Sequence, residues 1–120
     1  MKMAVKPNRR RAKGNQSELK TQKLLEKEGW RVYRVKGSTK FNKNVDIFGI
    51  FDILAVKKIF LSEAVGAKQM RRWIQVKTNK KIYGKELIPF KQFKEESCDN
   101  NDSVEIWSYM NRKGVEIKYV

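Results

Sequence analysis

The feature of this sequence that most constrains its fold is a near-continuous apolar run from Val45 to Val56, rich in β-branched and aromatic residues. Such a run is typical of a strand buried in the centre of a sheet rather than of a helix. Gly49 stands in the middle of the run, where a residue without a side chain often marks a bulge or a bend. The run therefore predicts a domain built around a central β-sheet.

Two other segments have the pattern of helices. The first is expected from about Gly14 to Glu28, ended by Gly29, and three of its residues are expected to face inward: Leu19, Leu24 and Leu25. The second is expected to start near Pro89, which suits a first helical position, with Phe90 and Phe93 on one face.

Strand patterns occupy most of the remaining chain. Besides the central run, the expected strands are Trp30–Val35, Arg72–Lys77, and a hairpin formed by Val104–Met110 and Val115–Tyr119. Within residues 57–71, the segment 59–61 could extend a hairpin, while residues 62–70 could form either a short helix or a mobile loop. The order helix, three strands, helix, two strands predicts an α/β fold with a mixed central sheet flanked by helices. We expect one domain over residues 13–120, preceded by a flexible basic arm over residues 1–12.

Composition limits the chemistry that this domain can perform. A chain of 120 residues with 40% hydrophobic residues can form one domain with a modest core. The sequence contains no histidine and a single cysteine, Cys98. Internal disulfides, Ser-His-Asp and Cys-His catalysis and two-histidine metal sites are therefore excluded. Catalysis would have to use carboxylates, amides, lysines, hydroxyls and a metal ion that prefers oxygen ligands.

The charge of the chain indicates a polyanionic partner. The formal net charge is +15, and the basic residues are concentrated in segments 1–17 and 71–94, where Glu86 is the single acid. A solubilising surface is the alternative, but such surfaces usually mix both signs of charge, so nucleic acid is the better interpretation. The candidate phosphate contacts are Arg9, Arg10, Arg11, Lys13, Arg34, Lys36, Ser38, Lys80, Lys81 and Lys85. We find no apolar stretch long enough to span a bilayer and no secretory signal, so we expect a cytoplasmic protein without membrane contact.

The strongest candidate for a functional site combines an acid in one apolar strand with a polar triplet in the next. Asp52 lies in the central run, and Gln75 and Lys77 alternate with apolar residues in the strand that follows. Because side chains alternate along a strand, Gln75 and Lys77 should share one face. Carboxylate and amide oxygens suit a magnesium ion, and a neighbouring lysine can stabilise charge on a reacting phosphate. In a basic chain, this pattern predicts metal-assisted cutting of nucleic acid.

Each of these three residues also has a structural interpretation. Asp52 could cap the strand or pair with a lysine, Gln75 could be a glutamine hydrogen-bonded within the sheet, and Lys77 could be one more phosphate contact. Two further acids are candidates for the same site. Asp46 could be a second metal ligand or a surface partner. Glu18 could reach the metal from the first helix, or it could form a capping box with Asn15 three residues earlier.

These residues resemble the PD-(D/E)xK nuclease superfamily, and within it the archaeal-type Holliday-junction resolvases and related phage proteins. The segments that carry the resemblance are a first-helix pattern, a basic serine-bearing loop, a metal-binding aspartate and an acid-x-lysine motif. The metal-binding aspartate lies in Phe51 to Leu54, the acid-x-lysine motif corresponds to Gln75 to Thr78, and the basic loop corresponds to Val35 to Ser38. The first-helix pattern consists of Arg11, Gly14, Glu18, Leu19, Leu24, Leu25, Glu26, Gly29 and Trp30. The glutamine at position 75 stands where those resolvases have glutamate.

The resemblance implies a restriction-endonuclease-like core and a magnesium-dependent endonuclease, with manganese as a possible substitute. Asp52, Gln75 and Glu18, with Asp46 as a rival, would hold the metal, and Lys77 would assist the nucleophile. The substrate would be branched DNA, in particular the four-way junction of DNA recombination and repair, cut by a homodimer. Two alternatives stay open: a catalytically inactive nuclease fold that binds nucleic acid, and an endonuclease with a flap or sequence-specific target.

Overall fold

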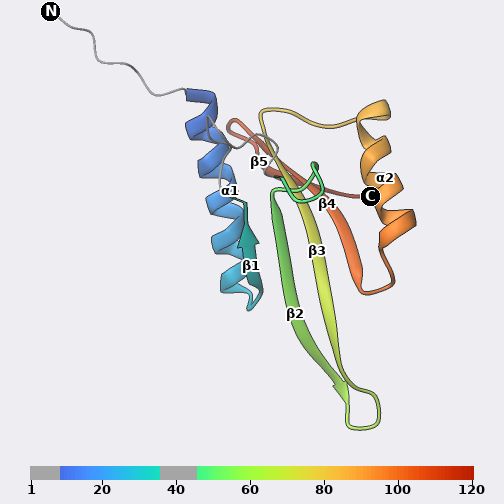
Figure 1. The fold of residues 1–120 in the computed structure, drawn as a ribbon. Helices are drawn as coiled ribbons and strands as arrows, with labels where there is room; N and C mark the ends of the chain where they lie inside the picture. Colours follow the sequence, from blue (N-terminus) through green and yellow to red (C-terminus); the bar gives the residue numbers. More distant parts are fainter. Residues whose placement is uncertain (1–8, 36–45) are drawn as a thin grey trace, which may run out of the picture.

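The computed structural model describes residues 9–35 and 46–120, with side chains from Gln16 onward in the first of these segments. The elements are helix α1 (Arg9–Lys27), strands β1 (Arg31–Arg34), β2 (Ile53–Ser62) and β3 (Gly66–Thr78), a 3₁₀ helix (Gly84–Leu87), helix α2 (Ile88–Ser97), and strands β4 (Asp102–Met110) and β5 (Gly114–Tyr119). The predicted order of helices and strands is confirmed (Figure 1).

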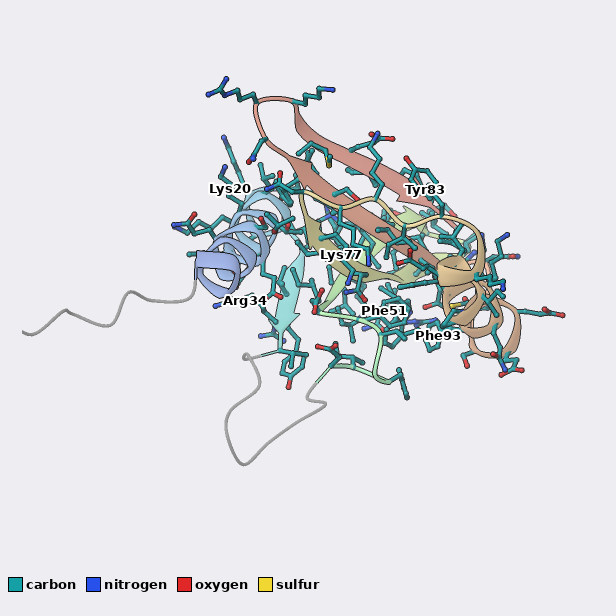
Figure 2. The ribbon with its side chains drawn as sticks, turned by 90° about the horizontal axis from the view of Figure 1, so that it is seen from above. Lys20, Arg34, Phe51, Lys77, Tyr83 and Phe93 are labelled. Atoms are coloured by element: carbon teal, nitrogen blue, oxygen red, sulfur yellow. The ribbon has the colours of Figure 1, made fainter. Side chains whose placement is uncertain are left out.

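The five strands form one sheet in the order β1-β2-β3-β4-β5. Neighbouring strands are antiparallel except β3 and β4, which are parallel because the chain between them crosses over through α2. Helices α1 and α2 lie on opposite sides of the sheet (Figures 1 and 2). The prediction of an α/β fold with a mixed sheet flanked by helices is therefore confirmed.

Helix α1 covers its face of the sheet with a narrow stripe of residues four positions apart. Ser17, Thr21 and Leu25 are buried. The side chains that form the core around Leu25 come from three strands: Ile53, Ala55, Ile74, Val76 and Trp107. Leu19 and Leu24, which were expected to face inward, are instead 39% and 46% exposed. That expectation is wrong because both leucines lie off the four-residue stripe, and two small polar residues occupy the buried positions instead.

The start of α1 also differs from the prediction, whereas its end does not. The helix begins at Arg9 rather than near Gly14, so Asn15 lies inside it. The capping-box interpretation of Glu18 is therefore wrong, because that device requires Asn15 at the helix start. Residues 9–12 of the expected arm belong to α1, and residues 1–8 lie outside the described part of the chain. Gly29 follows the helix with a φ of +93°, the left-handed conformation that ends helices.

Aromatic side chains form much of the core between α2 and the face of the sheet opposite to α1. Phe90 of α2 is buried, and Phe93 lies with it on the inner side of the helix, as predicted. The Phe93 ring centroid lies 4.9 Å from that of Phe51 and 5.0 Å from that of Trp73, both in edge-to-face arrangements. Three aliphatic residues complete this core: Ile82, Val104 and Ile106.

The apolar run that was expected to be one central strand is a turn followed by a strand. Residues 46–51 form a tight turn in which the N–H of Gly49 donates to the carbonyl of Asp46, and β2 begins only at Ile53. Phe48 and Gly49 have φ values of +53° and +72°. Two successive residues with positive φ reverse the chain, so the predicted bend at Gly49 is correct and the continuous strand is wrong.

Residues 57–71 continue β2 and β3 as a long antiparallel hairpin. Lys57 pairs with Met70, and the ladder extends to Ser62 opposite Gly66. From Lys57 and Met70 to the turn, β2 and β3 pair with each other and with no other described strand. This part of the hairpin therefore projects away from the five-stranded sheet (Figure 1). The expectation that 59–61 extend a hairpin is confirmed. The expectation of a helix or loop over 62–70 is wrong, because β3 already begins at Gly66 and pairs with β2. No helix in the described part of the chain is long and apolar enough to cross a membrane.

Two consecutive arginines of β3 are bound within the sheet. Arg71 donates two hydrogen bonds to the carboxylate of Asp102, at 2.6 and 3.1 Å. Arg72 donates two to Glu105, both at 2.7 Å. Both arginines belong to the basic segment 71–94 from which we predicted contacts with nucleic acid. Their charges are balanced by these two carboxylates, so both arginines add little to the basic surface.

Candidate functional site

Asp52 lies immediately before β2 and is held against β3. Its Oδ2 accepts a hydrogen bond from the backbone N–H of Val76 at 2.8 Å and another from Nε2 of Gln75 at 3.2 Å. Its own N–H donates to the carbonyl of Ile74 at 2.9 Å. The backbone bonds set the position of Asp52, and the structure thus brings it together with Gln75 as the sequence pattern predicts.

Gln75 and Lys77 share the face of β3 that is opposite to α1. Ile74 and Val76 are buried on the α1 face, and side chains alternate along a strand, so the residues between and after them point the other way. Gln75 is buried and Lys77 is partly exposed. Figure 2 shows Lys77 between the two helices, with Arg34 beside α1. A reactant could therefore reach Lys77 from solvent.

Two further carboxylates lie near this group. Glu18 of α1 forms an ion pair with Arg34 of β1, with 3.7 Å between Oε2 and Nη1. Burial raises the pKa of Glu18, the Arg34 guanidinium lowers it, and the charge of Asp46 raises it again, for a net increase. Asp46 itself is exposed at the start of the 46–51 turn. The turn returns the chain toward Asp52, which is why Asp46 comes near the site without belonging to the same strand.

The pKa of the Asp52 carboxyl depends on its burial and on the groups around it. Burial raises the pKa of its carboxyl from the ordinary value of 3.8 to about 7; the Val76 N–H and the charge of Lys77 lower it, and the charges of Glu18 and Asp46 raise it. All four residues therefore act on Asp52 electrostatically. An ionised carboxylate in this setting is costly unless a cation compensates it.

The atoms available at Asp52 suit a hard divalent cation such as magnesium. They are oxygens, the ligand type that magnesium prefers: carboxylates of Asp52, Glu18 and Asp46, and the amide oxygen of Gln75. Oδ1 of Asp52 accepts no hydrogen bond from a described residue. Adjacent ligands of an octahedral magnesium ion lie about 3 Å apart. The 3.2 Å between Asp52 Oδ2 and Gln75 Nε2 matches that spacing once the amide is turned over to present its oxygen.

The protein ligands would be few, because magnesium usually retains several waters. Among residues 9–35 and 46–120, no three acidic or cysteine side chains are gathered closely enough to hold a metal ion by themselves. Asp52 and the Gln75 amide, which lie within hydrogen-bond distance of each other, would be the direct protein ligands. Glu18 and Asp46 would act at a greater distance, through water or through their charge.

The predicted phosphate contacts near α1 and β1 are only partly described. Arg34 lies in β1, where its Nε also donates to Oε1 of Gln22 at 3.0 Å. Arg9, Arg10, Arg11 and Lys13 lie in the first half of α1, where the backbone alone is described. Lys36 and Ser38 lie outside the described residues.

The predicted phosphate contacts after β3 are partly engaged with acids. Lys80 pairs with Glu86 at 3.1 Å, and Lys81 pairs with Glu116 at 2.6 Å. Lys85 is exposed in the 3₁₀ helix. Surface ion pairs of this kind are weak and are readily exchanged for a phosphate, so the three lysines remain candidates.

Sequence reasoning missed two hydroxyl pairs that fasten α1 to the sheet beside this site. The Ser17 and Thr78 hydroxyls share a hydrogen bond of 2.8 Å, and those of Thr21 and Tyr109 share one of 2.7 Å. Serine and threonine inside a helix carry no clear signal in a hydropathy pattern. The four-residue spacing of Ser17, Thr21 and Leu25 is the one signal from which the buried stripe could have been found.

Comparison with known proteins adds no assignment to this geometry. No protein-family model matches the chain, and no curated protein is similar enough to it to indicate a common family.

Proposed function

We propose that the protein is a metal-dependent, structure-specific DNA endonuclease that resolves four-way junctions by phosphodiester hydrolysis. The observation that carries the proposal is the arrangement of Asp52, Gln75 and Lys77 on adjacent strands. There, a buried carboxyl with a pKa raised to about 7 faces an amide and lies near a lysine. The order of the elements and the parallel pairing of β3 and β4, with a helix on each face, are compatible with the restriction-endonuclease-like core that the sequence resemblance implies.

Each residue has a defined role in the proposed reaction. Asp52 and the Gln75 amide hold magnesium, or manganese in its place, and Glu18 and Asp46 add negative charge around it. The bound ion supplies Lewis-acid stabilisation of the phosphate and an activated water. Lys77 places an ammonium group beside the reacting phosphate, where it orients the water and stabilises the charge that develops in the transition state.

The proposed substrate follows from charge and from the sequence resemblance. A net charge of +15 favours a polyanion, and contacts to phosphates position DNA without reading its sequence. The resemblance further implies a homodimer, in which two copies of the site cut opposed strands of one junction. A flap or a specific duplex sequence is the competing target for the same chemistry.

A second candidate function is a nuclease fold that binds nucleic acid without cutting it. The observation that favours it is the hydrogen bond from the Gln75 amide N–H to Oδ2 of Asp52, in which Gln75 presents its nitrogen rather than its oxygen to the carboxyl group. A glutamine also brings one negative charge fewer than the glutamate that the resolvases resembled by this chain have at the same position. Metal-dependent turnover would eliminate this candidate.

The deciding experiment is cleavage of a labelled four-way DNA junction with and without magnesium, beside a matched flapped DNA and a linear duplex. We expect paired, magnesium-dependent nicks in the junction and none in the duplex. The Lys77→Ala variant is expected to lose cleavage by at least 10²-fold, because it removes the charge next to the reacting phosphate. Its affinity for the junction should stay close to that of the wild type, since one phosphate contact among many is a small loss.

Lys58→Ala serves as the matched control, since it removes a lysine charge from an exposed position in the β2–β3 hairpin and is not among the predicted phosphate contacts. It should cut at nearly the wild-type rate. A Lys77→Ala protein that folds but loses junction binding would make Lys77 a DNA contact rather than a catalytic group. Tight binding without cutting in either magnesium or manganese would leave the non-cutting nucleic-acid-binding protein as the function.

A further inference from the structure

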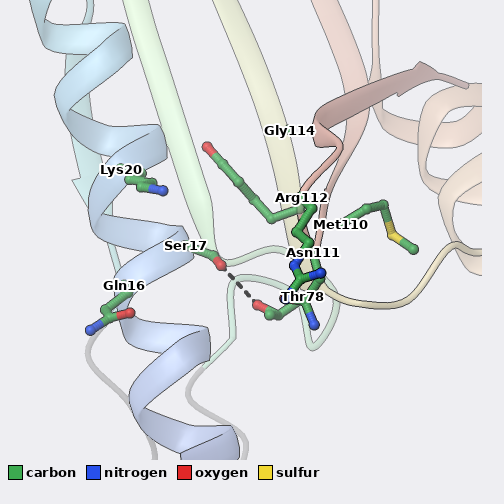
Figure 3. A pocket seen from close by; sticks show the side chains of 9 residues that line it. Gln16, Ser17, Lys20, Thr78, Met110, Asn111, Arg112 and Gly114 are labelled. Atoms are coloured by element: carbon green, nitrogen blue, oxygen red, sulfur yellow. Dashed lines mark hydrogen bonds between the residues drawn. The ribbon is translucent and has the colours of Figure 1, made fainter.

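A cavity of about 320 Å³ lies between the middle of α1 and the turn that joins β4 to β5. Its walls come from Ser17 and Lys20 on α1, Thr78 at the end of β3, Tyr109 in β4 and Arg112 in the turn. None of the residues that line it is acidic. Figure 3 shows Lys20 on the helix side of the cavity and Arg112 on the opposite, turn side. The cavity therefore has two cations across a polar space.

The hydroxyl groups inside the cavity make it a fixed structure rather than a gap between loose elements. Ser17 and Thr78 share the hydrogen bond drawn in Figure 3, and the Tyr109 hydroxyl is hydrogen-bonded to that of Thr21. By contrast, Lys20 and Arg112 are exposed, and neither forms an ion pair with a described residue. Two uncompensated cations facing a pre-formed polar cavity suit an anion.

The backbone at Arg112 gives a second reason to assign a function to this position. Arg112 has a φ of +62°, the left-handed region that a side chain with a Cβ enters at a cost of roughly 1 kcal/mol. Glycine would occupy it without that cost, as Gly114 does two residues later with a φ of +78°. The sequence therefore keeps a cation over the cavity at a position where the turn itself would favour glycine.

The cavity and the candidate functional site flank the same strand end. Lys77 and Thr78 are consecutive in β3 and point to opposite faces, so one belongs to the site and the other to the cavity. Glu18 and Ser17 are likewise consecutive in α1. A nucleic acid strand that places one phosphate at Lys77 thus has a second basic binding point a short distance away, on the other side of the end of β3.

We propose that this cavity binds a backbone phosphate of the nucleic acid, held by Lys20 and Arg112 and by the hydroxyl groups between them. The assignment deepens the proposed function, on which its choice of a nucleic acid rests, by adding a phosphate contact that is separate from the reacting one. Such a contact would hold the strand in register with the site without taking part in the cleavage step.

The test uses the double variant Lys20→Ala with Arg112→Gly. Alanine favours the helix and glycine suits the positive φ, so this protein should be at least as stable as the wild type. Binding to a labelled four-way junction and to a linear duplex is measured by fluorescence anisotropy in EDTA, where no cleavage occurs, over a range of salt concentrations. Affinity is expected to fall about tenfold, the loss of a charge-assisted contact. The slope of log K against log salt should drop by about 0.9, the value for one phosphate.

The charge-matched control is Lys68→Ala with Lys91→Ala, which removes two exposed lysines from the β2–β3 hairpin and from α2. An equal loss of affinity and slope in the control would show an effect of net charge alone and overturn the proposal. A fall in thermal stability of the cavity variant to below that of the control would show a structural role for Arg112 and also overturn it.

A direct readout separates this inference from the proposed function. In an NMR titration with short duplex DNA in EDTA, the amides of Ser17, Thr78 and Asn111 should shift in the wild type. If these amides shift while no DNA is ever cut, the phosphate site stands and the nuclease function fails. If junctions are cut while these amides stay unmoved, the nuclease stands and the phosphate site fails. Shifts caused by inorganic phosphate but not by DNA would assign the cavity to a small phosphate and overturn the backbone assignment.

Discussion

Replacing Asp52 by asparagine is expected to abolish cleavage and, at the same time, to stabilise the folded protein at neutral pH. Asparagine keeps an oxygen that can accept the hydrogen bond from the Val76 N–H, which now reaches Asp52 at 2.8 Å. It lacks the negative charge that burial and the neighbouring carboxylates of Glu18 and Asp46 make costly. The residue most needed for the proposed metal site is thus one that weakens the metal-free fold, a trade-off common at functional sites.

The stabilisation should depend on pH in a defined direction. The pKa of Asp52 is raised from 3.8 to about 7 by folding, so both the folded and the unfolded protein hold the proton below pH 4. Between pH 4 and pH 7 the unfolded chain releases the proton while the folded protein retains it, and the wild type loses stability as the pH rises. Above pH 7 this loss in the free energy of unfolding is complete. It amounts to about 4 kcal/mol for a pKa raised from 3.8 to about 7. The advantage of Asp52→Asn should therefore be near zero at pH 4 and largest above pH 7.

Chemical unfolding in EDTA at several pH values measures this advantage directly. Glu63→Gln is the matched control, because it neutralises one exposed acid at the tip of the β2–β3 hairpin and should show no such pH trend. Magnesium should raise the melting temperature of the wild type and leave that of Asp52→Asn unchanged, since a ligand stabilises the protein that binds it. An Asp52→Asn protein that is less stable than the wild type at pH 8 would mean that Lys77 compensates the carboxylate fully, and would contradict the prediction.

The parts of the fold that follow from periodic patterns could be predicted from the sequence. The two helices, the strand around Gln75 and the C-terminal hairpin each have a pattern that matches their local environment. The run before Asp52 could not be interpreted correctly, because an apolar segment that packs as a turn has the composition of a buried strand. The decisive fact there is the backbone conformation of Phe48 and Gly49, which hydropathy does not encode.

The candidate site could be predicted to a similar extent. Asp52, Gln75 and Lys77 were identified because a polar residue in an apolar strand stands out, and adjacency of the strands then brings them together. Which lysines and arginines are free for phosphate could not be predicted, since that depends on long-range pairing. Arg72 and Glu105 are 33 residues apart in the chain and meet only because β3 and β4 are parallel neighbours.

Among the polar contacts of the described residues, the pair of Arg72 and Glu105 is the one whose loss from one side alone should destabilise the fold most. Glu105 is fully buried and accepts hydrogen bonds from Arg72, from the Ser103 hydroxyl at 2.5 Å and from Nε1 of Trp107 at 3.0 Å. The Arg72 guanidinium also lies 5.1 Å from the ring centroid of Trp30, within range of a cation–π contact. Removing the acid alone leaves the arginine and two other donors without their acceptor.

We expect Glu105→Ala to lower the free energy of unfolding by about 3–5 kcal/mol, the usual effect of breaking a buried ion pair from one side. Urea unfolding at pH 7 measures the change. Glu28→Ala is the control, because Glu28 also approaches Arg72, at 4.0 Å, but its side chain is 64% exposed. That variant should lower the free energy of unfolding by less than about 1 kcal/mol.

Replacing both partners distinguishes the cost of an orphaned charge from the value of the pair itself. The double variant Arg72→Met with Glu105→Leu puts apolar side chains of similar size in place of the ions, and it should regain most of the stability that Glu105→Ala loses. The reason is that the penalty of the single change lies mainly in the unpaired arginine, which the double change removes. If the double variant is as unstable as Glu105→Ala, the ion pair and its hydrogen bonds hold β3 and β4 together in a way that apolar packing cannot replace.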